Sequence, residues 1–198
     1  MRPVLPTPRA SIRKAFADSI AVKRAFLREQ LATLADVGQL VAERFAEGNK
    51  LLLFGNGGSA ADAQHIAAEF VNRFAIERPP LPAIALTTDT SALTSIANDY
   101  RYDDVFAKQV EALGAPGDVA IAISTSGTSR NVVKAVTACR RRRIHTVGLT
   151  GGGGGKLAGM VDHLLDVSAS RETARIQETH ILAGHVICQL VDERLHGA

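Results

Sequence analysis

Several features that mark specialised classes of protein are missing from this chain of 198 residues. It lacks any apolar run of about 18 residues, so we expect no membrane-spanning helix. Its first residues, Met1 to Pro6, lack the continuous apolar stretch of a secretory signal. Only two cysteines occur, Cys139 and Cys188, and their spacing is not that of a disulfide framework. These absences predict reduced thiols and a cytoplasmic protein.

A strong charge of either sign is missing as well. The net charge of +3 slightly favours anionic substrates and gives no reason to expect a nucleic-acid partner. A hydrophobic content of 46% is typical of a compact α/β domain with a sizeable core. We therefore expect one domain over residues 1–198, with a helical segment over about 1–48 and an α/β core over about 50–198.

The order of the apolar patterns predicts a parallel sheet wrapped by helices. Apolar residues recur at helical spacing from about Ser11 to Glu47, and Gly48 is well placed to end that stretch. Five later runs have the length of buried strands, with helix-like segments between them. They are Leu51–Phe54, Ala83–Leu86, Val119–Ile123, Thr146–Leu149 and Leu164–Val167. Ligands of such folds lie beyond the carboxyl ends of the strands.

The most informative segment runs from Leu51 to Glu69 and predicts a strand, a glycine-rich turn and a helix. Glycines at positions 55, 57 and 58 would let backbone N–H groups approach an anion at the helix N-terminus. We expect Ser59 to cap that helix, with Asp62 near a capping-box spacing. His65 and Glu69 stand one turn apart and project from the same face. The segment therefore predicts an anion cradle beside a His/Glu pair.

A second loop, Ser124 to Asn131, follows another predicted strand and has five hydroxyl side chains around one glycine. A single loop of this kind is more often an ordinary capped turn, but two such loops favour a phosphorylated ligand.

A dinucleotide site is a weaker alternative. Gly55-x-Gly57-x-x-Ala60 fits a permissive fingerprint, but Asp89 lies 31 positions after Gly58, too far for the expected acidic residue.

Four segments together resemble the SIS domain family and, within it, the phosphoheptose isomerases. They are Gly55-Asn56-Gly57-Gly58-Ser59-Ala60-Ala61-Asp62-Ala63-Gln64-His65, Asn98-Asp99, Ser124-Thr125-Ser126-Gly127-x-Ser129 and Arg175-Ile176-Gln177-Glu178. The resemblance implies a doubly wound five-stranded sheet with N-terminal helices, and a homotetramer with active sites at subunit interfaces. It also implies conversion of D-sedoheptulose 7-phosphate to D-glycero-D-manno-heptose 7-phosphate, the first step of bacterial ADP- or GDP-heptose synthesis for lipopolysaccharide or capsule.

The resemblance also assigns roles to particular positions. The substrate-binding residues would be Asn56, Gly57, Gly58, Ser59, Glu69, Asn98, Asp99, Ser124, Thr125, Ser126, Ser129 and Gln177. One zinc ion per subunit would be held by His65, Glu69, Gln177 and His185. Asp62 would orient the imidazole of His65 from behind, or would simply be a carboxylate at a helix start.

Helix geometry supports only part of that ligand set. His65 and Glu69 are roughly 6 Å apart along a helix, so both can reach one ion. Gln177 and His185 are separated by roughly 12 Å of helix rise, and His180 would suit the spacing from Gln177 at least as well. The resemblance alone selects His185.

An aldose–ketose isomerase moves a proton between C1 and C2 through an enediol or enediolate, which requires a base and an acid partner. We assign these catalytic roles to Glu69 and His185.

A non-catalytic SIS protein that binds the replication initiator is the alternative within the same fold. One departure from some isomerases is Ala174, where they carry Asp. We expect Gly151–Gly155 to be a mobile connection and assign no role to the segment from Arg171 to Thr173.

Overall fold

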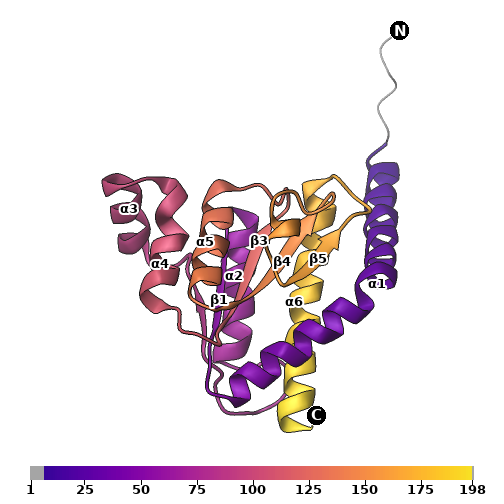
Figure 1. Cartoon of the computed structure of the whole chain (residues 1–198). Helices are drawn as coiled ribbons and strands as arrows, with labels where there is room; N and C mark the ends of the chain where they lie inside the picture. The colour runs from indigo at the N-terminus through magenta and orange to yellow at the C-terminus, as the bar shows by residue number, and fades with distance from the viewer. Residues whose placement is uncertain (1–6, 198) are drawn as a thin grey trace.

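The structure, a computed structural model, describes residues 7–197. It is a five-stranded parallel sheet with helices on both faces (Figure 1). The strands are β1 (Leu51–Gly55), β2 (Ala83–Ala85), β3 (Val119–Ser124), β4 (His145–Gly151) and β5 (His163–Val167). The helices are α1 (Pro8–Ala46), α2 (Gly58–Val71), α3 (Thr90–Asp99), α4 (Val105–Leu113), α5 (Arg130–Arg141) and α6 (Thr173–His196), with short 3-10 turns η1 (Tyr102–Asp104) and η2 (Leu157–Gly159).

The sheet confirms the doubly wound architecture that the sequence predicts. The strand order is β2-β1-β3-β4-β5, with every neighbouring pair parallel. The chain builds outward from β1 to β2 and then returns to place β3 on the other side of β1. The order therefore reverses beside β1 and β3, whose carboxyl ends carry the two loops predicted to bind an anion.

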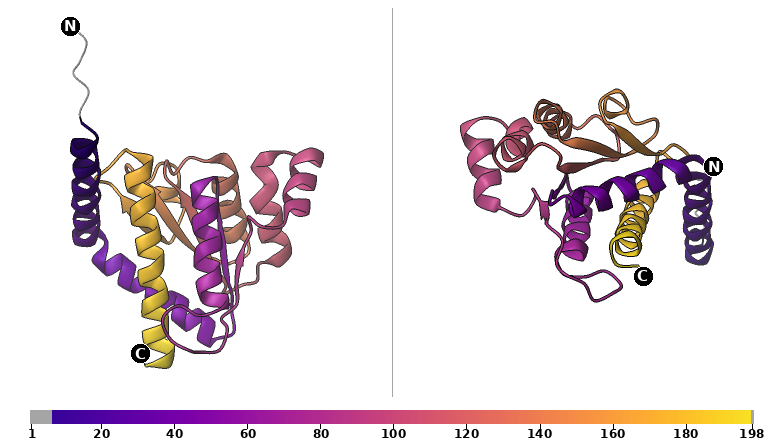
Figure 2. Two further views of the ribbon diagram at one scale, coloured as in Figure 1. Left: turned by 180° about the vertical axis from the view of Figure 1, so that it is seen from behind. Right: turned by 60° about the horizontal axis from the view of Figure 1, so that its bottom comes forward.

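Alternate side chains of each central strand enter different cores. Leu51 and Leu53 of β1 pack on the face covered by α1, α2 and α6. Leu52 and Phe54 pack on the opposite face, against α4 and α5. The right-hand view of Figure 2 shows the helices of the two faces on opposite sides of the sheet. The continuous burial of β1 and β3 follows from this arrangement, because a strand covered on both faces has no solvent-facing side.

The predicted N-terminal helical segment is a single long helix. α1 is 39 residues long, and the Thr7 hydroxyl caps it by accepting from the amide of Ala10. It changes direction along its length and reaches β5 and α6 (Figure 1). Gly38 allows α1 to cross α6 closely, because a Cβ there would lie 2.5 Å from Leu190 Cδ1. Gly48 follows the helix with a φ of +83°, as its predicted role as terminator requires.

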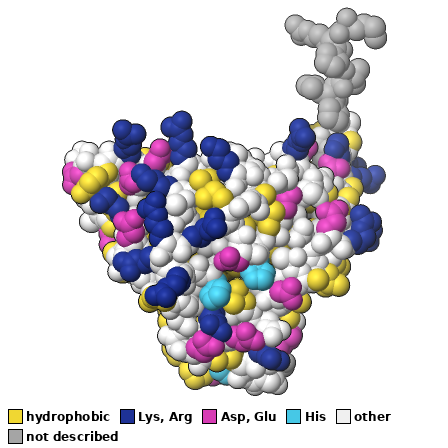
Figure 3. All heavy atoms as spheres, viewed as in Figure 1, with side chains coloured by type: hydrophobic (Ala, Val, Ile, Leu, Met, Phe, Trp, Pro, Cys, Tyr) yellow, Lys and Arg dark blue, Asp and Glu magenta, His cyan; other side chains and the backbone are white. Residues whose placement is uncertain are grey.

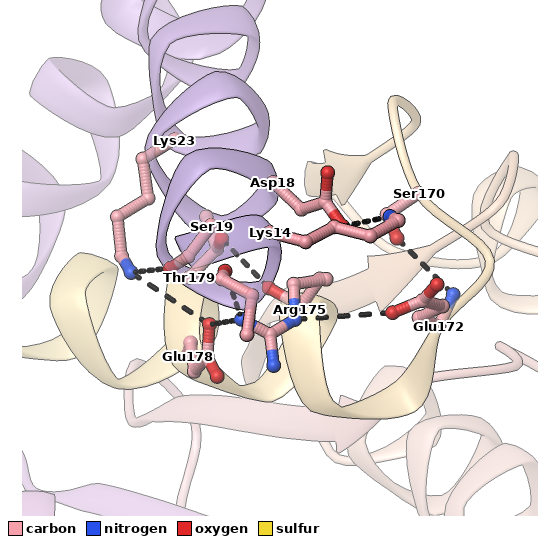
Figure 4. A network of polar contacts seen from close by, with 10 residues as sticks. Lys14, Asp18, Ser19, Lys23, Ser170, Glu172, Arg175, Glu178 and Thr179 are labelled. Atoms are coloured by element: carbon pink, nitrogen blue, oxygen red, sulfur yellow. Dashed lines mark hydrogen bonds and ion pairs between the residues drawn. The ribbon is translucent and has the colours of Figure 1, made fainter. Parts of the chain in front are cut away.

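A polar network ties the first half of α1 to the start of α6 (Figure 4). Arg175 donates from Nη1 to the Ala15 carbonyl at 2.8 Å and pairs with Glu178 at 3.0 Å. Lys23 also approaches Glu178, at 4.0 Å. Arg175 lies in the segment Arg175 to Glu178 that carried the resemblance, but its side chain is used to hold two helices together.

Within residues 7–197, none of the helices is sufficiently long and apolar to cross a membrane. The expectation about Met1 to Pro6 falls outside the described residues. Cys139 and Cys188 are free and buried in α5 and α6. Burial raises the pKa of each thiol to about 12, so both stay protonated and unreactive at neutral pH.

Candidate active site

The glycine-rich turn after β1 places the start of α2 at the switch in strand order. Gly57 is the N-cap, with a φ of +56°, and no side chain within residues 7–197 caps the helix. The predicted Ser59 cap is therefore wrong. Ser59 already lies inside the first turn and is buried, because the glycine conformation at position 57 starts the helix one residue before it. The free amides of this turn remain available to an anion.

Two asparagine side chains lock the glycine turn to the second loop. Asn56 donates from Nδ2 to Asn131 Oδ1 at 2.9 Å, and Asn131 returns the bond to Asn56 Oδ1 at 2.8 Å. The Tyr102 hydroxyl donates to the same Asn56 oxygen at 3.3 Å. Asn56 is a predicted substrate-binding residue, and both ends of its side-chain amide also fix the distance between the two loops. Sequence reasoning did not identify Asn131 as its partner.

The hydroxyls of the second loop bond mainly to one another. Ser124 and Ser129 share a hydrogen bond of 3.0 Å between their hydroxyl oxygens. Ser126 accepts from the amide of Thr128 at 3.3 Å and from its hydroxyl at 3.0 Å. Ser129 is the N-cap residue of α5, yet its side chain bonds to no backbone amide of the helix. The loop is thus stabilised by hydrogen bonds among its own hydroxyls at the N-terminus of α5.

A recess of about 430 Å³ opens next to this loop. Thr125 and Ser126 line one side, and Gly151 and Gly152 at the end of β4 line another. Arg171 and Thr173, just before and at the start of α6, complete the polar wall. Sequence reasoning left both unassigned. The usable signal was their position after β5, because the carboxyl end of that strand meets the same edge of the sheet.

The glycine run after β4 packs against the second loop. A Cβ on Gly127 would lie 1.9 Å from the Gly154 carbonyl oxygen, and a Cβ on Gly155 would lie 2.5 Å from the Ser126 carbonyl oxygen. Gly153 donates to the Asp166 carboxylate at 2.9 Å. The prediction of a loose connection over Gly151–Gly155 therefore missed this packing, which needs glycine on both sides to bring two backbones together.

Three ionisable side chains meet where α2 and α6 face each other. His65 Nε2 lies 3.1 Å from Glu69 Oε1 and 3.2 Å from His185 Nε2. The rings of His65 and His185 have centroids 5.0 Å apart, and the Phe74 ring lies 5.6 Å from that of His185. Gly184 makes the approach feasible, since a Cβ there would lie 2.5 Å from Ile66 Cδ1.

The donor set of this cluster fits a metal ion. One donor atom from each of His65, Glu69 and His185 lies within 4.8 Å of the other two. Ligands about 2.0–2.1 Å from a tetrahedral zinc ion stand roughly 3.3 Å from one another, close to the two measured separations. Gln177 lies against the first turn of α2, where its amide nitrogen would be 2.4 Å from a Cβ on Gly58. The cluster proper is thus two imidazoles and a carboxylate.

The structure distinguishes His180 from His185, the two histidines of α6 between which helix geometry could not choose. His180 is fully buried, and its Nε2 hydrogen-bonds to the Thr150 carbonyl at 2.9 Å. Burial lowers the pKa of His180, which keeps the imidazole neutral. It points toward the sheet, whereas His185 points toward α2. Sequence spacing alone could not distinguish them, because the rotation of α6 is set by its tertiary packing, mainly against α1 and α2.

Three further predicted residues lie outside this arrangement. Asp62 makes no hydrogen bond to His65 among the described residues, and its Oδ2 is buried without a partner. Desolvation raises its pKa. Asn98 and Asp99 are exposed at the end of α3, where Asn98 donates to Asp99 Oδ1 at 2.9 Å. α3 lies at the outer edge of the molecule, beyond α4 (Figure 1).

Comparisons with known proteins identify the family of this chain. The SIS domain family matches residues 15–151. Phosphoheptose isomerases of Thermodesulfovibrio yellowstonii and Roseiflexus sp. are 54% and 58% identical to the chain, covering 93% and 89% of it and 91% and 89% of their own lengths. The solved phosphoheptose isomerase of Neisseria gonorrhoeae is 46% identical, with a TM-score of 0.89, over 94% of this chain and all of its own. The chain belongs to the phosphoheptose isomerases of the SIS domain family.

Proposed function

We propose that the protein converts D-sedoheptulose 7-phosphate to D-glycero-D-manno-heptose 7-phosphate. The observation that carries this proposal is the His/Glu/His cluster, in a fold that also provides a recess suited to a phosphate. A recess lined by hydroxyls and backbone beyond the carboxyl ends of β3 and β4 suits a phosphate monoester. A His/Glu/His cluster stands on the helix that begins at the neighbouring glycine turn. The relatives compared above carry the name of the same activity.

The phosphate end of the sugar would be held by Ser124, Thr125, Ser126 and Ser129 with the amides of the glycine turn at Gly57 and Gly58. Arg171 adds a guanidinium to the recess, where it can bond a phosphate oxygen. Ser59, Asn98 and Asp99 remain part of the proposed substrate set by resemblance. For Asn98 and Asp99, exposure at the end of α3 is compatible with a contact to the sugar of a neighbouring subunit.

Proton transfer is assigned to the other end of the site. Glu69 Oε1 faces His65, which leaves Oε2 to take a proton from C1 of the ketose. The C–H electron pair then forms the C1–C2 double bond, and the C2 oxygen receives a proton from His185. Return of a proton to C2 and loss of one from the C1 hydroxyl gives the aldose. A general acid–base pair of this kind contributes roughly 10²–10⁴-fold to rate.

We infer that His65, Glu69 and His185 also hold one zinc ion per subunit, with the Gln177 amide oxygen as a fourth ligand from α6. The ion would supply polarisation of the sugar oxygens during enolisation. The fit rests on the separation and type of the three donor atoms. Zinc content by atomic emission, measured for the wild type and for His65→Ala, tests the ligand set without an activity assay. Equal zinc in both proteins would refute it.

We further propose that the chain forms a homotetramer with active sites at subunit interfaces. Large apolar side chains are exposed along one side of α1, with Leu182 of α6 nearby: Ile12, Phe16, Ile20, Leu27 and Leu31. Between α1 and α6 lies an apolar groove of about 300 Å³. An exposed apolar surface of this extent is typical of an interface. Buried reduced thiols favour a cytoplasmic location. We propose that the product is used in heptose synthesis for lipopolysaccharide or capsule.

Turnover of purified protein on sedoheptulose 7-phosphate, followed by NMR of the product, tests the proposed reaction. Chelation followed by addition of zinc shows whether the metal is needed. No conversion by a folded, zinc-loaded protein would overturn the isomerase proposal and favour a binding module.

A dinucleotide site is disfavoured by Asp89, because its carboxylate is used to cap α3 by accepting from the Ala92 amide at 2.9 Å.

A further inference from the structure

A second recess, of about 340 Å³, lies on the other side of the loop between Ser124 and Ser129. Four cationic side chains line it: Arg101 before η1, Arg130 and Lys134 of α5, and Lys156 after the glycine run. The only carboxylate in its lining is that of Asp103. Lys and Arg side chains crowd the surface over α3, α4 and α5, at the left of Figure 3. The recess is therefore the hollow part of a basic surface.

Acidic neighbours neutralise these cations only in part. Arg130 Nη1 lies 3.9 Å from Asp103 Oδ2, and 85% of the Arg130 side chain is exposed, so this pair is weak. Lys134 pairs with the carboxylate of Asp104. Arg101 and Lys156 form no ion pair with any residue in the range 7–197. Four cations held near two carboxylates leave an excess of positive charge that a bound anion would relieve.

The chemistry of this recess differs from that of the substrate recess. Hydroxyls, backbone amides and one guanidinium surround the substrate recess and suit a single compact phosphate. Here the charges come from three separate segments, and one loop hydroxyl, that of Thr128, adds a hydrogen-bonding group. Cations spread in this way match an anion with charges at more than one phosphorus atom. We propose that the recess is a second anion site for a small molecule that carries at least two phosphate groups.

The two recesses share one wall. Thr125 and Ser126 face the substrate recess, and Thr128 and Arg130 face the second one. Thr128 donates twice to Ser126, and Gly154 packs against Gly127 with no room for a side chain. The segment that contains the glycine run also contacts both recesses: Gly152 lines the substrate recess, and Lys156, just after the run, lines the second one. An anion in the second recess will therefore weaken phosphate binding in the first by repulsion across a short, rigid wall, and the effect will be reciprocal.

Isothermal titration with pyrophosphate tests the proposal without any turnover assay. Wild-type protein at about 0.15 M salt should bind one pyrophosphate per subunit in the second recess. The double variant Arg130→Ala/Lys134→Ala should bind it at least about tenfold more weakly. Arg141→Ala removes an exposed cation from the same helix outside the recess and should leave pyrophosphate affinity unchanged within about twofold. Circular dichroism of each variant establishes that it is folded.

Orthophosphate distinguishes the two recesses. Arg171→Ala should weaken orthophosphate binding and leave pyrophosphate binding in the second recess intact, and the double variant should show the reverse. ADP titrated in parallel shows whether a nucleoside diphosphate or free diphosphate is preferred. Preference for either ligand supports the proposal if the double variant binds that ligand more weakly. It is overturned if wild type shows no saturable pyrophosphate binding, if the double variant binds as wild type does, if Arg171→Ala alone abolishes binding, or if only a long oligonucleotide binds.

Discussion

The two ends of the proposed active site are built in different ways. The phosphate end consists of turns whose positions are set by backbone and amide contacts, such as the reciprocal pair of Asn56 and Asn131. The proton-transfer end consists of three ionisable side chains on α2 and α6, of which His65 is about half exposed. The phosphate end can bind a ligand without titrating groups, whereas the other end depends on how closely two helices approach. Binding and chemistry should therefore be separable by mutation.

Glu69→Gln should produce the largest separation. The amide has nearly the same shape but cannot take a proton, so we expect kcat to fall by roughly 10²–10⁴-fold. Affinity for orthophosphate should be unchanged, because its recess lies at the other end. Steady-state kinetics and isothermal titration measure the two quantities. Glu111→Gln, on the exposed side of α4, is the matched control, and a similar loss of kcat there would contradict the assignment.

Gly184→Ala should disturb the proton-transfer end through packing alone. Its new methyl group would start 2.5 Å from Ile66 Cδ1, which forces α2 and α6 apart. We expect a loss of about 1–3 kcal/mol in the free energy of unfolding, measured by urea denaturation. The kcat should fall as well, since His185 would move away from His65. A variant as stable and active as wild type would show that the helix contact does not position the cluster.

Arg171→Ala should act on the phosphate end. Losing one charge-assisted contact should raise KM about tenfold, with little change in kcat. Arg171→Lys should recover part of the affinity, because the positive charge remains without the forked geometry. If KM is unchanged in both variants while kcat falls, Arg171 does not bind the phosphate.

The smallest effect concerns His180, the neutral counterpart of His185 on the same helix. Its pKa is lowered in the folded state, so the unfolded chain binds a proton first as pH falls below about 6.5. The free energy of unfolding should therefore decrease with falling pH, by at most about 1.4 kcal/mol per pH unit from this residue, until the folded pKa is reached. His180→Gln should flatten this dependence, and His196→Gln, on the exposed end of α6, should not. Equal slopes in all three proteins would refute the account of His180.

Local rules predicted much of this molecule. The five strands were predictable because each is a short apolar run, and the pairing of His65 with Glu69 because helix geometry fixes it. The start of α2 was not predictable, since the conformation of Gly57 begins the helix before Ser59 and overrides the preference of serine for the N-cap position. The choice of His185 over His180 depends on how α6 is rotated against the sheet. Arg171 enters the recess only because three strand ends converge, which no local pattern in the chain encodes.

The most direct measurement of the central claim is isomerisation in D₂O, analysed by NMR at equilibrium. If Glu69 moves the proton between C1 and C2 through an enediol, solvent deuterium will appear at C2 of the aldose and at one C1 position of the recovered ketose. Glu69→Gln should show no incorporation over the same period. Full conversion by the wild type without any deuterium at either carbon would contradict the account, because the hydrogen would then have passed directly between the carbons.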